Sequence, residues 1–459
     1  MERRKLLLVG LMIFSMFFGA GNLIFPPQLG QLSGTNTMVS LVGFLISAVG
    51  LPILAIAVVA KSGGLHILAS RVHPRFAFAF TILIYLSIGP FLGIPRAASL
   101  AFEIGISPFL PNTVGGSNLP LFIYTLVYFG IAYWLCMSPS KLVDRFGKVL
   151  TPALLVLITY IFVFSLFKPL GVFEAPIGDY AQFPLLKGFL DGYMTMDAIA
   201  ALNFGIVISL ALKEMGVTEE KKLVSNTIIA GVIAGLLLAI IYGMLAYLGA
   251  VSQTRFGTTK NGAQILTNVV FYLFGQKGSI LLGVIFSLAC LTTSVGLLTS
   301  CSQYFAKLMP KVSYRSFIAL LSVSSMIFAN VGLTQILKFS VPILTAIYPM
   351  AIVLMVLALL NNLFKGNSYV YLFAMICTSF VSILEALGQF GLKINILYSL
   401  PFYLKGLSWI IPAVVGAILG FIYGKLSNDM SPVKWTVFSR INSFVRRIIE
   451  YFSSCRISK

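Results

Sequence analysis

The chain has 459 residues, of which 58% are apolar and 10% are charged, and its mean hydropathy is +0.97. Soluble domains are about 45–50% apolar and about 25% charged, so this composition excludes a water-soluble enzyme, a nucleic-acid-binding domain and a disordered scaffold. The 32 lysines and arginines against 13 acids give a net charge of +19, but they lie in short segments between apolar runs, as in a membrane protein.

Twelve apolar runs are long enough to cross the hydrocarbon core of a bilayer, which takes about 20 helical residues. In chain order they cover residues 6–31, 37–60, 76–102, 119–137, 148–167, 186–212, 224–249, 277–304, 314–332, 335–361, 369–388 and 405–425. The sequence therefore predicts an all-α polytopic membrane protein with about 12 transmembrane helices. The first run follows Arg3, Arg4 and Lys5 but is longer than the apolar core of a signal peptide, so we expect it to remain as the first helix.

The loop charges predict the orientation of these helices. If the N-terminus is cytoplasmic, the cytoplasmic segments carry 23 lysines and arginines and the outer segments carry eight. Positive residues accumulate on the cytoplasmic side of membrane proteins, so we expect both termini in the cytoplasm. An even number of helices agrees with this placement.

Two of the runs contain residues that interrupt a membrane helix, Phe18–Asn22 in the first and Asp191–Asp197 in the sixth. Inside a bilayer, irregular backbone is tolerated only where protein buries it or where it lines a water-filled cavity. The interruptions hold corresponding positions in two five-helix halves, residues 6–167 and 186–361. Paired interruptions of this kind predict an inverted-repeat secondary transporter whose substrate binds at the breaks.

The break in the first run predicts how a substrate binds. N–H groups at the start of a half-helix attract a carboxylate, and glycine lets a ligand approach the backbone closely. Carbonyl groups freed at the end of the preceding half-helix accept from an ammonium group, so a zwitterionic amino acid would satisfy both. The predicted substrate-binding residues are Gly19, Ala20, Gly21 and Asn22 in the first run and Tyr193, Met194 and Thr195 in the sixth. The alternative is that the glycines only permit tight packing of helices.

Hydroxyl groups in the eighth run predict a cation site. Thr292 and Thr293 carry adjacent hydroxyls, and hard cations prefer oxygen ligands. Together with the carbonyl groups of Ala289 and of Phe18 at the first break, they would hold a sodium ion. The alternative is that both hydroxyls bond back to carbonyls of their own helix.

Three charged residues within the runs, Arg96, Asp197 and Glu385, are candidates for coupling charges. Charges inside a bilayer are costly and usually functional. We expect Arg96 to pair with an acid on another helix, with Asp197 as the first candidate, and the alternative is a static structural ion pair. If protons drive transport, Asp197 or Glu385 would carry the proton.

The sequence changes character at about residue 430. From Val437 to Phe452, apolar residues recur at i, i+3, i+4 and i+7, and the arginines lie off this stripe. This pattern predicts a basic amphipathic helix on the anionic inner leaflet. The chain thus divides into a transmembrane transporter domain, residues 1–429, whose last two helices lie within 369–425, and a cytoplasmic tail, residues 430–459.

In the twelfth run, Gly416, Gly420 and Gly424 recur every four residues and leave one helix face without side chains. Such a stripe lets a second backbone approach closely. A second protomer is therefore one candidate partner for this helix, which makes a homodimer possible, and packing against the eleventh helix or a lipid is the alternative.

Further residue patterns limit the kinds of chemistry that this protein can perform. The five cysteines form no CxxC pair, the two histidines share one loop, and no phosphate-binding glycine-rich motif occurs. We therefore predict no enzymatic activity, no cofactor, and no metal beyond a coupling Na⁺. The predicted partners are a small amino acid and the lipid bilayer, without nucleic acid. A channel and an integral-membrane enzyme remain as alternatives.

Four stretches resemble the bacterial branched-chain amino acid carriers, the BrnQ or LIVCS family. They are Phe18–Pro27, Ile94–Glu103, Asp191–Ile208 and Leu288–Leu297, and the resemblance extends over all twelve runs. It implies a cation-coupled symporter that imports leucine, isoleucine and valine by alternating access, with Na⁺ or H⁺ as the coupling ion. It also implies a LeuT-like fold, a 5+5 inverted repeat with broken helices 1 and 6, in the bacterial inner membrane. A related carrier for methionine or another apolar amino acid is the alternative.

A more distant similarity, to the leucine transporter of the sodium-symporter family, extends to single residues. Gly19–Asn22 matches its first-helix motif, which implies that Asn22 faces one sodium ion or the substrate. Ala289–Thr293 matches its eighth-helix motif and implies the second sodium site. Asp197 stands where that family has a serine, and no counterpart of its polar seventh-helix residue is identifiable.

Overall fold

The computed structural model describes residues 3–427 apart from 112–117, 138, 215, 216, 218 and 393. Throughout these residues the regular structure is helical, and no strand occurs in them. The predicted all-α class is therefore confirmed for the described part of the chain. The predicted amphipathic tail, residues 430–459, lies outside the described residues.

The chain is a succession of helices joined by turns and by longer connections, such as those at residues 168–178 and 390–409. The first helices are α1 (Arg3–Phe17), α2 (Ala20–Ser33), α3 (Thr37–Leu45), α4 (Leu51–Ser62), α5 (Leu65–Ser70), α6 (Pro74–Leu86), α7 (Gly93–Gly105), α9 (Leu119–Cys136) and α10 (Pro139–Phe167). Those that follow are α11 (Asp179–Gln182), α12 (Pro184–Tyr193), α13 (Asp197–Glu214), α14 (Glu220–Phe256), α15 (Gly262–Leu308), α16 (Tyr314–Ala329), α17 (Leu333–Leu359), α18 (Ser368–Gln389) and α19 (Ile410–Leu426). Two π-helical turns, η2 (Ile46–Gly50) and η3 (Ser87–Phe91), interrupt the second and third predicted runs.

The first and sixth predicted runs are each divided into two helices, as the sequence predicts. The first helix, α1, ends at Phe17, and Gly19 has an extended backbone before α2 begins. In the sixth run, α12 ends at Tyr193 and α13 begins four residues later. Between these helices Met196 has a φ of +69°, a left-handed conformation that is strained for a residue with a side chain.

A third break, which the sequence analysis did not predict, divides the run at residues 76–102. Gly89, inside η3, departs from helical backbone with φ −83° and ψ −118°. Gly89-Pro90 and Pro95 are the residues that indicate this break. The apolar composition of the run concealed it, because membrane helices tolerate proline where neighbouring helices satisfy the freed backbone groups.

Seven helical segments of the described residues are long and apolar enough to cross a bilayer, fewer than the twelve runs predicted from the sequence. Three shorter apolar helices accompany them, at Pro152–Phe167, Tyr314–Ala329 and Ile410–Leu426. The numbers differ because the breaks divide the first and sixth runs into shorter helices, and because Ala20–Ser62 joins parts of two predicted runs.

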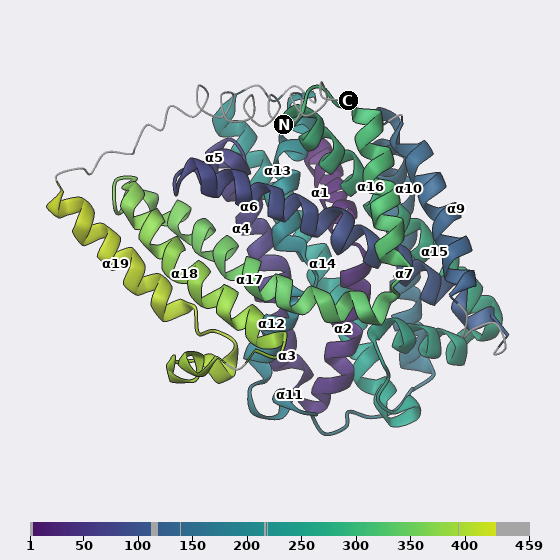
Figure 1. Cartoon of the computed structure of the whole chain (residues 1–459). Helices are drawn as coiled ribbons and strands as arrows, with labels where there is room; N and C mark the ends of the chain where they lie inside the picture. Colours follow the sequence, from purple (N-terminus) through teal and green to yellow (C-terminus); the bar gives the residue numbers. More distant parts are fainter. Residues whose placement is uncertain are drawn as a thin grey trace, which may run out of the picture.

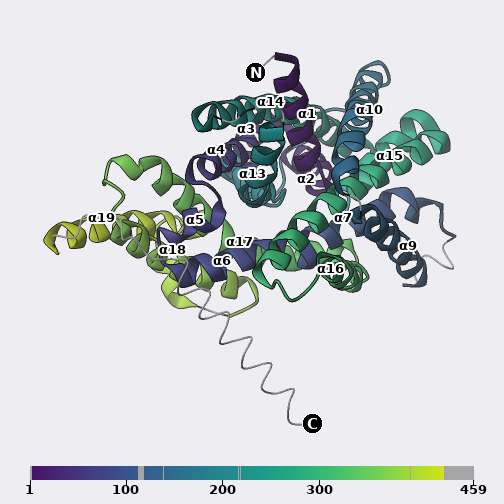
Figure 2. The same ribbon diagram turned by 90° about the horizontal axis from the view of Figure 1, so that it is seen from above.

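The broken helices lie in the middle of the molecule, where glycines allow very close packing (Figure 1). Helix α2 packs against α14, and α12 packs against α3. A Cβ at Gly249 on α14 would lie 1.9 Å from the carbonyl oxygen of Pro27, and a Cβ at Gly188 on α12 would lie 1.9 Å from that of Ser40. Seen from above, α18 and α19 form one side of the molecule and α9, α10 and α15 form the other (Figure 2).

The glycine stripe of the twelfth run packs within the chain. Helices α18 and α19 lie side by side at the edge of the molecule (Figure 1). A Cβ at Gly416, Gly420 or Gly424 would lie 2.6, 2.3 or 1.9 Å from atoms of α18 or of Asn367, the residue that precedes it. The expectation that this stripe meets a second copy is therefore corrected, since the backbone of α18 already occupies the close approach that the glycines permit.

Candidate functional site

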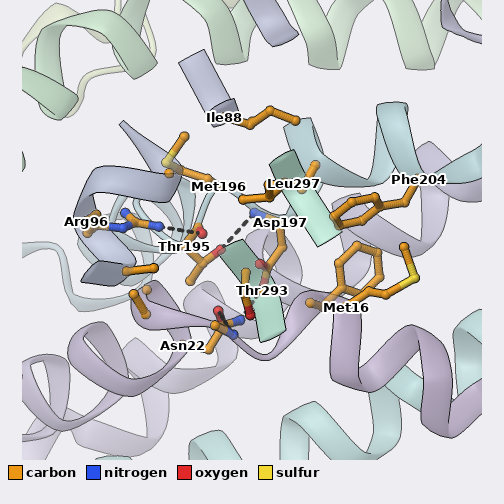
Figure 3. Close-up of a pocket in the computed structure, with 17 residues that line it drawn as sticks. Met16, Asn22, Ile88, Arg96, Thr195, Met196, Asp197, Phe204, Thr293 and Leu297 are labelled. Carbon is orange, nitrogen blue, oxygen red and sulfur yellow. Dashed lines mark hydrogen bonds between the residues drawn. The ribbon is translucent and has the colours of Figure 1, made fainter. Parts of the chain in front are cut away.

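A cavity of about 40 Å³ lies where the breaks in the first and sixth runs meet (Figure 3). This volume admits only a few water-sized spheres. Eight of the 17 lining residues were predicted from the sequence, namely Gly19, Ala20, Gly21, Asn22, Arg96, Thr195, Asp197 and Thr293. The remaining lining residues are nearly all apolar and were not predicted, namely Met16, Phe17, Ile88, Gly93, Ala97, Met196, Ala200, Phe204 and Leu297.

Asn22 joins the start of α2 to the two helices beside it. Its side-chain oxygen accepts a hydrogen bond of 3.1 Å from the N–H of Gly19, which satisfies one backbone group at the first break. Its Nδ2 donates to Oδ2 of Asp197 over 2.5 Å and also to the hydroxyl of Tyr242. The side chain is 1% exposed, so these three partners hold it in one orientation.

Asp197 begins α13 and accepts hydrogen bonds from two other helices. Besides the amide of Asn22, the hydroxyl of Tyr242 donates to its Oδ2 over 3.1 Å. A carboxylate is also stabilised at the first residue of a helix by the helix dipole. The buried group formed by Asn22, Asp197 and Tyr242 therefore connects α2, α13 and α14, and we call it the polar trio.

Tyr242 is the residue of the polar trio that the sequence analysis missed. It lies in the seventh predicted run, where no polar counterpart was identified, and its side chain is fully buried. A tyrosine counts as apolar in a hydropathy scan, although its buried hydroxyl needs a hydrogen-bond partner. That requirement is the signal that would have drawn attention to it.

Arg96 lies on α7, 4% exposed, with its guanidinium against the end of α12. Its Nη1 donates to the carbonyl of Met194 over 2.5 Å, and its Nη2 donates to that of Thr195 over 3.1 Å. The expected pairing with Asp197 is not observed, since the ion pairs in the described part of the chain do not include Arg96. The arginine instead places its charge at a helix C-terminus, which favours cations.

The two glycines of the first break allow neighbouring helices to pack closely, besides letting a ligand approach the backbone. A Cβ at Gly21 would lie 2.8 Å from Nη2 of Arg96 and 2.9 Å from Cα of Thr195, so the alternative of tight packing applies at this residue. A Cβ at Gly19 would lie 3.1 Å from Cγ2 of Thr293 on α15. The first break is thus held between the sixth-run break and the eighth run.

The hydroxyls of the predicted cation site bond within α15. Thr292 donates to the carbonyl of Ala289 over 2.7 Å, and Thr293 donates to the same oxygen over 3.2 Å. This is the back-bonded arrangement named as the alternative. Only Thr293 of this group lines the cavity, whereas Phe18, Ala289 and Thr292 do not. A bound cation would have to compete with these two hydroxyls for the Ala289 carbonyl.

The remaining predicted residues lie away from the cavity lining. Tyr193 stacks on Tyr348 of α17, with ring centroids 4.3 Å apart. Met194 contributes its carbonyl to Arg96 and is otherwise outside the lining. Glu385 lies on α18, where it accepts a hydrogen bond from the hydroxyl of Ser408. The structure therefore separates Glu385 from the group that contains Arg96 and Asp197.

Comparisons with known proteins agree with this architecture. A family model described as branched-chain amino acid transport protein matches residues 2–427. The chain is 46% identical to the branched-chain amino acid permease BrnQ of Bacillus subtilis over 424 residues, which are 91% of this chain and 96% of that protein. It is 40% identical to the branched-chain amino acid transport system 2 carrier protein of Pseudomonas aeruginosa over 427 residues, which are 92% of this chain and 96% of that protein.

A solved structure has a fold similar to that of this chain. The transporter Mhp1 of the nucleobase-cation-symport-1 family, in a closed conformation with bromovinylhydantoin bound, superimposes with a TM-score of 0.63 over 96% of each chain. Its sequence is 13% identical to this chain, so the comparison concerns the fold alone.

Proposed function

This chain belongs to the family of branched-chain amino acid transport proteins, and on that premise we propose that it imports leucine, isoleucine and valine. It is a membrane transporter and not an enzyme. The observation that carries the proposal is the meeting of two helix breaks at one cavity, where helix-start N–H groups, freed carbonyls and apolar side chains converge.

We also propose that the chain crosses the bacterial inner membrane twelve times, with both termini in the cytoplasm. The proposed core is a 5+5 inverted repeat, residues 6–167 and 186–361. The breaks at corresponding positions of the two halves and the similarity in fold to Mhp1 support this arrangement.

The proposed substrate lies between the two breaks. Its carboxylate faces the first residues of α2, and its ammonium group faces the carbonyls at the end of α12. Its branched side chain packs against the apolar wall that Met16, Phe204 and Leu297 provide. Because the cavity measures only about 40 Å³, binding requires the surrounding helices to separate, as alternating access does.

We propose that Na⁺ or H⁺ drives the uptake of the amino acid. The test measures leucine uptake into proteoliposomes, first with an inward sodium gradient at equal pH, then with a pH gradient without sodium. We expect one gradient to drive leucine accumulation above equilibrium, and isoleucine and valine to compete more strongly than methionine. Exchange without accumulation under either gradient would contradict symport, and stronger competition by methionine would favour the related-carrier alternative.

Removing both hydroxyls of the proposed sodium site tests that site directly. Thr292→Val with Thr293→Val keeps the side-chain shapes but deletes the two oxygen atoms. We expect sodium-stimulated leucine uptake to fall at least about tenfold, since each lost ligand weakens binding by about 1 kcal/mol. The serine double variant, which keeps both hydroxyls, should retain the stimulation. Equal sodium dependence in the valine variant and the native chain would show that the hydroxyls only bond back to Ala289.

A homodimer through α19 also stays a proposal. Because the glycine stripe packs against α18, a second copy would meet the opposite, exposed side of the helix, which includes Val414, Ile418 and Ile422. Lipid is the other occupant that such an apolar side accepts.

A further inference from the structure

Arg96 is a buried cation at the wall of the proposed transport cavity, and no acid of the described residues lies in ion-pair contact with it. Its acceptors are the backbone carbonyls of Met194 and Thr195, and its Nε has no hydrogen-bond partner in the described structure. The ring of Phe25 lies 5.8 Å from the guanidinium carbon and offers only a weak cation–π contact. Burying a charge is destabilising unless good contacts compensate for its lost hydration, and here the guanidinium donates to neutral carbonyl groups alone.

The carboxylate that lines the same cavity is engaged elsewhere. Asp197 accepts from Asn22 and Tyr242 within the polar trio. Asp197 is also the one acid among the residues that line the cavity in the described structure. Asp197 therefore makes no direct ion pair with the guanidinium, and a carboxylate that binds Arg96 directly would come from a molecule that enters the cavity.

The position of the guanidinium indicates what that molecule offers. Nη2 of Arg96 would lie 2.8 Å from a Cβ at Gly21, so the guanidinium touches the first turn of α2. The same Nη2 donates to the carbonyl of Thr195, and Nη1 donates to that of Met194, at the end of α12. The arginine thus lies between the helix start that attracts an anion and the helix end that attracts a cation (Figure 3).

We propose that Arg96 recognises the carboxylate of the transported amino acid. In the structure the guanidinium caps the carbonyl end of α12. When substrate enters, its ammonium group takes over these carbonyls, and the guanidinium turns to the substrate carboxylate, which its planar fork can bind through two parallel hydrogen bonds. The inference rests on the proposed function, because it assigns a role to Arg96 at that same site.

This exchange makes recognition depend on both charges of the substrate. A ligand without an ammonium group cannot replace the guanidinium at the α12 carbonyls. A ligand without a carboxylate replaces it but leaves the displaced guanidinium buried and unpaired. The site should therefore select α-amino acids over the corresponding amines, amides and carboxylic acids.

The experiment compares leucine with leucinamide, which keeps the ammonium group and the side chain but has no carboxylate. Binding of both ligands is measured by competition with radiolabelled leucine on the purified carrier, for the native chain and for Arg96→Gln. We expect the native chain to prefer leucine by about 100-fold or more, as a charge-assisted bidentate pair provides. In Arg96→Gln the preference should fall to about tenfold or less, because leucine binds more weakly while leucinamide, which no longer leaves a guanidinium unpaired, binds at least as well as to the native chain.

Arg71→Gln is the matched control, because Arg71 is a partly buried arginine that donates to Tyr371 and lies outside the cavity lining. It should keep the native preference.

A folded Arg96→Gln that keeps the native preference would overturn the proposal, and so would an equal loss for both ligands, since that is the result expected of a residue that only caps α12. If Arg96→Gln does not fold, Arg96→Lys replaces it, and the lysine cannot form the two parallel bonds. A roughly tenfold smaller preference supports the proposal and an unchanged one overturns it. A native chain that binds no leucine would instead refute the proposed function.

Discussion

Replacing Asp197 by alanine is expected to reduce leucine uptake at least about 100-fold and to lower the melting temperature of the carrier. The carboxylate accepts from Asn22 and Tyr242, which lie on α2 and α14. Without it, two buried donors lose their acceptor, at a cost of about 1–3 kcal/mol each. The start of α13 also loses its link to both helices at the point where the substrate is proposed to bind. Initial uptake rates per inserted carrier, together with thermal unfolding, provide the measurement.

Two conservative variants separate the contribution of the Asp197 carboxylate from that of the Tyr242 hydroxyl. Asp197→Asn keeps the shape and one acceptor oxygen, so it should unfold at a temperature between those of the native and alanine chains. Tyr242→Phe removes the bonds of the tyrosine hydroxyl to Asp197 and Asn22 but leaves the bond between Asn22 and Asp197, so it should be milder than Asp197→Ala. If Asp197 carries a coupling proton, Asp197→Asn will exchange leucine but not accumulate it under a pH gradient. An alanine variant with native uptake would show that the polar trio has no part in transport.

Gly249→Ala is expected to prevent the carrier from folding, although it adds a single methyl group. That methyl would lie 1.9 Å from the carbonyl oxygen of Pro27 on α2, and the atom it meets belongs to backbone. Overpacking of this kind costs about 3 kcal/mol or more where the neighbour cannot move. Helices α2 and α14, which both contribute to the polar trio, would be forced apart. The measurement is the yield of monodisperse carrier in detergent and its melting temperature.

Gly243→Ala is the matched control on the same helix. A Cβ at Gly243 meets nothing closer than Cδ2 of Leu41 at 3.9 Å, which is an ordinary contact. Alanine is the better helix former by about 1 kcal/mol, so this variant should be as stable as the native chain or slightly more stable. Equal behaviour of the two variants would contradict the packing described between α2 and α14.

Hydropathy and residue type were enough to predict the helical class and the place of the two main breaks. Glycines and acids inside apolar runs stand out because a bilayer tolerates irregular backbone and charge only for a reason. For the same reason Gly19–Asn22, Arg96, Thr195 and Asp197 could be selected as site residues, and all of them line one cavity in the structure. The third break was missed, because proline in an apolar run does not decide between an intact and a divided helix.

The partner of each of these residues depends on how the helices pack against one another. Hydropathy and periodicity describe one helix at a time and carry no information about the helix that faces it. Arg96 donates to carbonyls about a hundred residues along the chain rather than to Asp197, and Asn22 meets a tyrosine 220 residues away. The glycines of α19 face α18 and not a second copy. A helix face without side chains can pack against any neighbouring backbone, and in the folded chain that neighbour is α18.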